Sequence, residues 1–260
     1  MRWFDAGVNQ FDQRLPIEQT LTAAERAGVT RLCVIATEES EWSSSLAWQN
    51  QYPEQICCTL GVHPHNADNV SSDWVSKLTT LASQSNVAAI GECGLDYNRM
   101  FSTRDNQLQV FEHQLNVATQ LQLPVYLHER DAFPDQYALL NQYVGDLNGG
   151  LVHCFTSHTE HLKAYLELGF YIGITGWICD TKRGVELREA LAYLPLDRLV
   201  LETDAPYLFP KGMKPRQRNN QPANLPFIAE RVAELKQVSV EQLSQVSIIN
   251  TNKLLWRTHD

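Results

Sequence analysis

The amino-acid sequence predicts a single (β/α)8 barrel, also called a TIM barrel, that covers residues 1–260. The chain length of 260 residues is close to the ~250 residues typical of this fold. Short apolar segments alternate with helical segments along the whole chain, which is the pattern of βα units and a parallel sheet. Eight apolar segments of strand character can be counted, and no repeat, low-complexity tract or linker divides them. Together these observations predict one continuous domain.

The expected strands are short apolar runs, and the first begins almost at the start of the chain. The runs cover residues 3–8, 31–36, 55–62, 87–92, 125–128, a segment that starts at Gly149-Gly150, 170–174 and 198–202. The first residues lack the charged and then apolar layout of a signal peptide, and no apolar run approaches the ~20 residues of a membrane span. We therefore expect a cytoplasmic protein with no membrane partner.

The first helix is expected at residues 16–27. Ile17, Leu21 and Ala24 form an apolar stripe at helical spacing, and Gly28 closes the helix. A second helix near residues 39–49 precedes the third strand.

The clearest helix follows the fourth strand. Ser102 with Asp105 three residues later is a capping-box signature, which places the start of the helix. Apolar residues follow at helical spacing, namely Leu108, Phe111, Leu115 and Ala118, and Pro124 marks the exit. Further helices are expected at residues 135–144, 159–168, 185–194, 225–235, 240–244 and 249–255.

The composition indicates an ordinary globular domain, neither a disordered chain nor a membrane protein. Hydrophobic content of 43% and charged content of 20% are ordinary for a globular domain. The six cysteines form no CxxC pair and are expected to be buried free thiols. A net charge of −9 argues against nonspecific attraction to nucleic acid, but it leaves room for a metal-bridged phosphate site. The one basic cluster, Lys211, Lys214, Arg216 and Arg218, is either a solvated loop or a phosphate contact.

Acidic and imidazole side chains close several of the expected strands. A carboxylate such as Glu92 at the end of a buried strand must be hydrogen-bonded, paired or coordinated. In a parallel barrel the carboxyl ends of the strands meet at one face. Mixed imidazole and carboxylate ligation is typical of a divalent metal site. The expected metal ligands are Glu92, His128, His153 and Asp204, and His63 closes a further strand.

Three neighbouring residues have open roles. Glu202 lies two residues before Asp204 and so on the same strand face, where it could be a ligand or an acceptor for a histidine N–H. His65 is either a site residue or a structural histidine. Asp96 could orient a ligand or cap the next segment.

Six motifs resemble those of the TatD family of metal-dependent deoxyribonucleases. They are Gly-Val-His-Pro-His at 61–65, Gly-Glu-Cys-Gly-Leu-Asp-Tyr at 91–97, His-Glu-Arg-Asp-Ala at 128–132, His-Cys-Phe-Thr at 153–156, Tyr-Ile-Gly-Ile-Thr-Gly-Trp at 171–177 and Glu-Thr-Asp-Ala-Pro-Tyr-Leu at 202–208. The resemblance implies an amidohydrolase-like metal-dependent barrel. It also implies Mg²⁺-dependent 3′-to-5′ exonuclease action on single-stranded DNA or RNA, with a part in DNA repair.

The resemblance also implies roles for individual residues. Glu92, His128 and His153 would be metal ligands, and Asp204 would be a ligand or general base. His63 would face the substrate phosphate as a catalytic residue. The residues expected at the substrate are His65, Arg130 and Glu202.

The chain departs from the family pattern near its start. Most members open with Asp-x-His-x-His, whereas this chain has Gly7 and Asn9 at the two histidine positions. With fewer nitrogen ligands, a hard Mg²⁺ ion is favoured over Mn²⁺ or Zn²⁺. Near the other end, Asn219-Asn220-Gln221-Pro222 replaces the family's Arg-Asn-Glu-Pro.

Two other functions are compatible with these residues. The same ligands could activate water against an amide, lactone or aminoacyl ester. A noncatalytic binding module that has lost one metal subsite is the second alternative, and Gly7 and Asn9 are its only hint. We expect a monomer in every case.

Overall fold

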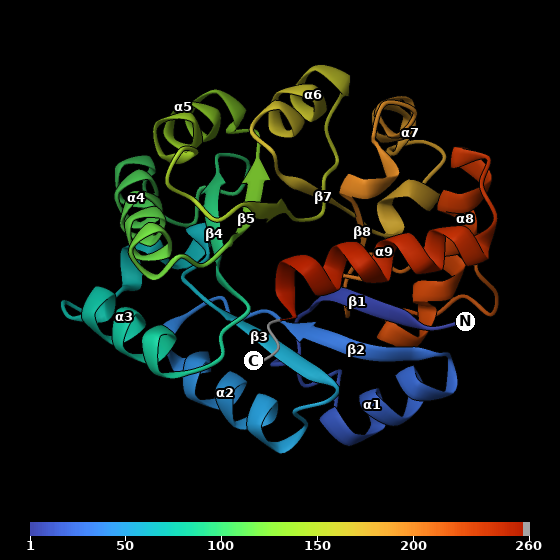
Figure 1. Cartoon of the computed structure of the whole chain (residues 1–260), viewed down its shortest axis with the longest axis horizontal. Helices are drawn as coiled ribbons and strands as arrows, with labels where there is room; N and C mark the ends of the chain where they lie inside the picture. Colours follow the sequence, from blue (N-terminus) through green and yellow to red (C-terminus); the bar gives the residue numbers. More distant parts are fainter. Residues whose placement is uncertain (257–260) are drawn as a thin grey trace.

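The computed structural model describes residues 1–256, so residues 257–260 of the predicted domain lie outside this description. Eight parallel strands follow one another in sequence order around a barrel, and helices surround them (Figure 1). The (β/α)8 prediction is confirmed. The strands are β1 (Trp3–Val8), β2 (Val29–Val34), β3 (Ile56–Leu60), β4 (Ala89–Asp96), β5 (Val125–Arg130), β6 (Gly150–Val152), β7 (Tyr171–Ile174) and β8 (Leu199–Leu201).

The barrel closes between β1 and β8 through a short set of backbone contacts. Val8 and Ala205 form an isolated parallel bridge. The Asn9 N–H donates to the Ala205 carbonyl at 2.8 Å, and the Asp204 N–H donates to the Gly7 carbonyl at 3.0 Å. The closure therefore brings the carboxyl ends of the first and last strands together.

Nine α-helices lie within the described residues. Seven of them match single helices expected from the sequence. The nine helices are α1 (Ile17–Arg26), α2 (Trp42–Gln51), α3 (Trp74–Gln84), α4 (Arg104–Leu121), α5 (Phe133–Tyr143), α6 (Thr159–Glu167), α7 (Val185–Leu191), α8 (Leu225–Lys236) and α9 (Val240–Leu255). Short 3₁₀ turns, such as Pro64–Asn69 after β3, complete several of the connections.

Two helix predictions were incomplete. Helix α3 was missed, although Trp74, Val75, Leu78, Leu81 and Ala82 form an apolar stripe at helical spacing. Residues 240–255 were expected as two helices but form the single helix α9. Polar residues such as Asn250 and Thr251 are buried in its middle, and they interrupt the apolar stripe that periodicity detects.

The capping-box prediction at Ser102 was wrong. Helix α4 begins at Arg104, after Thr103. The Ser102 hydroxyl instead donates to the His65 carbonyl at 2.9 Å and accepts from the Asp68 N–H at 3.0 Å. The Asp68 carboxylate, in the β3–α3 connection, accepts from the Thr103 N–H just before the first turn of α4. A tertiary contact here replaces the local one.

The core has two layers, one inside the barrel and one between strands and helices. The inner layer includes Phe4, Ile35, Tyr126, Leu151 and Val200, and the end of α9 packs against it. All six cysteines are free thiols, five of them buried and Cys154 partly so, as expected. Within residues 1–256 no helix combines the length and the apolar character that crossing a membrane needs.

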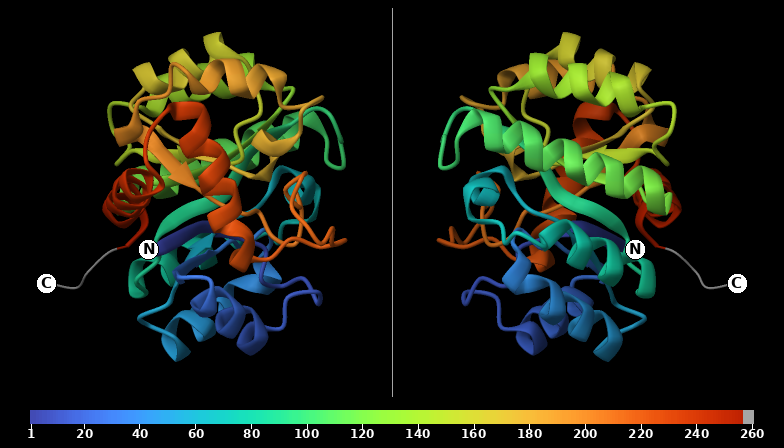
Figure 2. Two further views of the ribbon diagram at one scale, coloured as in Figure 1. Left: turned by 90° about the vertical axis from the view of Figure 1, so that its right-hand side faces the viewer. Right: turned by 90° about the vertical axis from the view of Figure 1, so that its left-hand side faces the viewer.

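The βα loops project from one end of the barrel. Figure 2 shows the loop that follows β8, coloured orange, extending beyond the barrel at the same end as the green loop between β4 and α4. Helix α9 covers the opposite end, where the amino ends of the strands lie. The open end is therefore the face at which the strand-end residues gather.

Candidate active site

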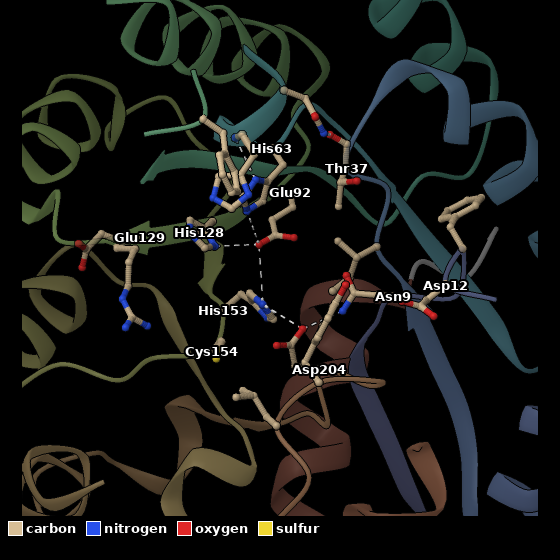
Figure 3. Close-up of a pocket in the computed structure, with 18 of the residues that line it drawn as sticks. Asn9, Asp12, Thr37, His63, Glu92, His128, Glu129, His153, Cys154 and Asp204 are labelled. Carbon is tan, nitrogen blue, oxygen red and sulfur yellow. Dashed lines mark hydrogen bonds and ion pairs between the residues drawn. The ribbon is translucent and has the colours of Figure 1, made fainter. Parts of the chain in front are cut away.

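Side chains from the carboxyl ends of the strands line a cavity of about 820 Å³ (Figure 3). Pockets of ~300–1,000 Å³ are typical for small ligands. Five lining residues come from five different strands or from the loops directly after them, and these are His63, Glu92, His128, His153 and Asp204. The sequence analysis placed each of them at a strand end, and the barrel brings all five together.

Glu92 lies at the centre of this group. Its Oε1 atom is 3.0 Å from His128 Nδ1, 3.5 Å from His63 Nε2 and 3.8 Å from His153 Nε2. Burial by itself raises the pKa of the Glu92 carboxyl, but the three imidazoles outweigh burial and hold that pKa well below its usual range. Glu92 is therefore an ionised carboxylate at the point where three histidines meet.

His63 is oriented by its neighbour in the chain. The His65 N–H donates to His63 Nδ1 at 3.1 Å, so the neutral ring carries its proton on Nε2. Burial lowers the pKa of His63 to about 3, which keeps the ring neutral. His63 thus directs an N–H donor toward Glu92 and the cavity.

Asp96 holds two imidazoles and the start of the following loop. Its Oδ2 atom lies 2.7 Å from His65 Nε2 and 3.3 Å from His128 Nε2. Its Oδ1 atom accepts the backbone N–H groups of Asn98 and Arg99. The two roles that the sequence left open for Asp96, orienting a histidine and capping a segment, are both present. The pKa of His128, lowered by burial but raised by Asp96 and Glu92, is about 9.

His153 is held from behind by a buried pair. Glu202 Oε2 lies 2.6 Å from His153 Nδ1, and the Tyr126 hydroxyl oxygen lies 2.9 Å from each of these two atoms. Burial lowers the pKa of His153, but Glu202 outweighs it and raises the pKa to about 10. With Nδ1 occupied, Nε2 points to Glu92 and Asp204, as in carboxylate–histidine–metal arrangements.

Glu202 itself does not line the cavity. Its side chain is fully buried, and its second oxygen accepts the Cys154 N–H at 2.5 Å. The expectation that Glu202 contacts substrate is therefore corrected, because no part of the carboxylate reaches the open space. Its position matches the alternative role, an acceptor for a histidine N–H.

Asp204 lies opposite Glu92, and Asn9 fixes one of its oxygens. Asn9 Nδ2 donates to Asp204 Oδ1 at 2.8 Å, which leaves Oδ2 as the freer acceptor. Burial raises the pKa of Asp204 to about 6, and His153 opposes this shift. Asn9 thus acts on the site indirectly, by orienting the Asp204 carboxylate.

Tyr126 occupies the space that a side chain at position 7 would need. A Cβ atom on Gly7 would overlap the Tyr126 hydroxyl and lie 2.7 Å from Glu202 Oε2. A histidine cannot be accommodated there without moving this buried pair. The departure at position 7 is therefore built into the packing behind His153.

The remaining donors fit a divalent cation. Ligand atoms of His63, Glu92 and His128 lie within 4.8 Å of one another, and so do those of His153, Cys154 and Asp204. The Cys154 thiol is a poor ligand, because burial raises its pKa well above the usual value and keeps it protonated. Imidazole and carboxylate donors without the thiol are the chemistry that divalent metals use in hydrolases.

Other predicted and unpredicted residues are also placed. His65 and Arg130, expected at the substrate, line the cavity. Tyr126 and Glu129 were missed as site residues. The sequence around Tyr126 is that of an ordinary buried strand, whereas Glu129 follows His128 directly and could have been predicted. Asn220, in the divergent segment, is buried and donates to the Thr203 carbonyl at 2.9 Å, which supports the strand end before Asp204.

Comparison with known proteins identifies the family of this chain. The family model described as TatD-related DNase matches residues 4–256. A relative from Pectobacterium parmentieri, named 3′-5′ ssDNA/RNA exonuclease TatD, is 41% identical over 257 residues, which cover 96% of this chain and 98% of that protein.

Solved structures show the same fold. A TatD homologue from Escherichia coli K12 has a TM-score of 0.88 and 28% identity, with 99% of each chain covered. A Saccharomyces cerevisiae protein described as an uncharacterized amidohydrolase has a TM-score of 0.86 and 21% identity, covering 98% of this chain and 100% of that one. Because the family match spans almost the whole sequence, this chain belongs to the TatD-related DNase family.

Proposed function

We propose that this protein is a metal-dependent 3′-to-5′ exonuclease that hydrolyses single-stranded DNA or RNA. Family membership supports phosphodiester hydrolysis, and the Pectobacterium parmentieri relative is named for this activity. The single observation that carries the proposal is the meeting of Glu92, two ring-oriented histidines and Asp204 in one cavity.

A divalent cation belongs to this proposal. When bound, it lowers the pKa of water and offsets negative charge on the phosphoryl oxygens. Mg²⁺ is the proposed ion, because hard carboxylate oxygens make up half of the ligand set, with Mn²⁺ or Zn²⁺ as alternatives. The residues that would hold it are Glu92, His128, His153 and Asp204.

Asp204 is the proposed general base. Its pKa, raised by burial to about 6, leaves the carboxylate ionised at neutral pH yet close to the value that suits a base there. Because Asn9 occupies Oδ1, Oδ2 is free to accept the proton of the attacking water. Asn9 thereby fixes the direction in which the base faces.

His63 and Arg130 are the proposed phosphate-binding groups. His63 offers its Nε2–H, because His65 occupies the other ring nitrogen. Arg130 adds a fixed positive charge in the same cavity. Donors placed at the nonbridging oxygens would stabilise the charge that develops during attack.

Expectations about oligomeric state, cellular location and DNA repair also belong to this proposal. A monomer is supported by the origin of all the site residues in one chain. A cytoplasmic location and a part in DNA repair are proposed from the family resemblance.

The test is cleavage of 5′-labelled single-stranded DNA with Mg²⁺. We expect a ladder that shortens from the 3′ end and is lost with EDTA or with Asp204→Asn. The matched control is Asp197→Asn, which changes an exposed carboxylate in the turn before β8 and should cleave normally. Internal fragments at the earliest times would indicate an endonuclease, and the absence of cleavage with Mg²⁺, Mn²⁺ and Zn²⁺ would contradict the proposal.

A further inference from the structure

Charge is unevenly distributed around the mouth of the barrel. Residues 205–229, which include the loop after β8, contain four basic residues and no acidic residue, although the chain carries a net charge of −9. The loops after β2 and β3, residues 35–41 and 61–73, contain five acidic residues and no Lys or Arg, and Lys77 of α3 pairs with two of them, Glu39 and Asp73. A polyanion leaving the cavity is therefore repelled on one side and attracted on the other.

Two guanidinium groups connect the cavity with the basic side. Arg130 lines the cavity, and its Cζ lies 5.8 Å from the centroid of the Trp177 ring. Arg183 Cζ lies 4.4 Å from the same ring, and 60% of the Arg183 side chain is exposed. Trp177 thus holds an inner and an outer cation beside each other.

Asp180 joins this pair to the loop after β8. Its buried carboxylate pairs with Arg183 Nε at 2.7 Å and with Lys211 Nζ at 2.6 Å. It also accepts the backbone N–H groups of Lys182 and Arg183. The hydrogen bonds from Lys211 and Arg183 hold the pKa of Asp180 well below its usual range. One carboxylate therefore fixes two basic side chains from different loops while leaving their outer surfaces exposed.

We propose that Arg130, Arg183, Lys211, Lys214, Arg216 and Arg218 form a cationic track for the backbone phosphates of the strand on the 5′ side of the cleaved bond. The inference rests on the proposed exonuclease function. The loop that carries residues 211–218 extends outward from the mouth (Figure 2), and Lys214, Arg216 and Arg218 are exposed on it. Asp180 is a positioning residue in this arrangement.

The track explains how a long strand can be held by a small cavity. A 3′-to-5′ exonuclease takes the 3′ end inside, so the 5′ part must leave through the mouth. A cavity of about 820 Å³ encloses only the end of such a strand. Phosphates outside the cavity bind most favourably where cations are exposed, because each phosphate–cation contact releases counterions. The acidic loops after β2 and β3 disfavour an exit on their side of the mouth.

The test compares two triple variants with equal change in net charge. The first, Lys214→Gln/Arg216→Gln/Arg218→Gln, removes the outer track. The control, Arg26→Gln/Lys163→Gln/Lys253→Gln, removes three exposed cations from helices α1, α6 and α9. Binding of a 5′-fluorescein single strand of about 12 nucleotides is measured by anisotropy across a salt series with Mg²⁺, in an Asp204→Asn background that preserves the strand.

The track triple should weaken binding at least tenfold at low salt and reduce the slope of log K against log salt by about 2, because each lost contact removes roughly 0.7 for single strands. The control triple should change the slope little. In the cleaving protein, the track triple should lower kcat/KM for the long strand more than for a dinucleotide, which does not reach the outer loop.

Two results would overturn the inference. The first is a track triple that binds the strand as tightly as the parent protein. The second is an equal loss of affinity in both triples, which would indicate a general charge effect. Because binding is read without cleavage, failure of the track is distinguishable from failure of the exonuclease proposal. A wild-type protein that cleaves the strand while the track triple binds normally would overturn only the track.

Discussion

Tyr126 and Gly7 form a complementary pair behind the site. The Tyr126 hydroxyl lies 3.1 Å from the Ala6 carbonyl and 2.9 Å from Glu202 Oε2, in the space beside the glycine. The phenol is fully buried, and its pKa is raised well above the usual value by burial and by Glu202, so it stays protonated. Glycine at position 7 is therefore required by packing against this hydroxyl and by the anchoring of His153.

We predict that Gly7→Ala lowers the free energy of unfolding by about 1–3 kcal/mol, because the added Cβ overlaps the Tyr126 hydroxyl. Adding Tyr126→Phe should recover part of this loss. The free energies come from urea denaturation of the two single variants and the double variant. Gly145→Ala is the matched control, since a Cβ there meets no atom within 4 Å. Additive effects of the two substitutions would contradict the pairing.

His63 provides a second prediction at the level of single residues. If its Nε2–H serves the phosphate, His63→Ala should lower kcat by about 10²–10³ without changing the affinity for Mn²⁺. Steady-state kinetics and calorimetric titration of the ion measure the two effects. His113→Ala, on α4 beside Trp74, is the control outside the site. A matching fall in ion affinity would make His63 a ligand instead.

At the level of elements, buried glutamines from the outer helices hold the ends of strands. Gln114 on α4 accepts the Val62 N–H at 2.8 Å and donates to the Val62 carbonyl at 3.0 Å, just before His63. Gln107 bonds both backbone groups of Asp96, and Gln136 on α5 accepts the Leu95 N–H. These bonds satisfy backbone groups where neighbouring strands no longer can.

We predict that Gln114→Leu lowers the free energy of unfolding by about 1–3 kcal/mol, because it leaves both backbone groups of Val62 buried and unpaired. It should also lower activity by displacing His63. Chemical denaturation and the cleavage assay read the two effects. Gln109→Leu, at an exposed position of the same helix, should leave stability within about 0.5 kcal/mol of wild type. An equal effect at both positions would contradict the assignment.

At the level of the whole molecule, the barrel gathers like charges at one end. Glu92 and Glu202 both raise the pKa of Asp204, in addition to burial. The carboxyl ends of the strands converge regardless of the charge on their side chains. The carboxylates of this chain therefore lie close together, and a bound cation would reduce their mutual repulsion. Stability and ion binding should therefore be coupled.

We predict that Mg²⁺ at about a hundredfold excess over its Kd stabilises the protein by ~2.7 kcal/mol, a rise in Tm of about 5–10 °C that EDTA reverses. Thermal unfolding with and without the ion measures this. Glu92→Gln should abolish most of the shift, whereas Asp197→Asn should keep it. An undiminished shift in Glu92→Gln would place the ion elsewhere.

The sequence was sufficient for the fold class, because apolar periodicity and chain length report directly on alternating strands and helices. It was also sufficient to bring His63, Glu92, His128, His153 and Asp204 to one face, since the carboxyl ends of parallel strands must meet there. Boundaries were less accurate. Strand β4 runs on to Asp96 because glutamines from α4 and α5 support its end, and a window of local sequence does not contain those partners.

Sequence alone thus determined which residues reach the open end of the barrel, because that depends on their position along each strand. The tertiary structure alone decided how they face one another. That Asp96 orients two histidines, that Glu202 stands behind His153, and that Tyr126 fills the place beside Gly7 are contacts between residues distant in the chain. Such contacts depend on the barrel's register and closure, which no local pattern encodes.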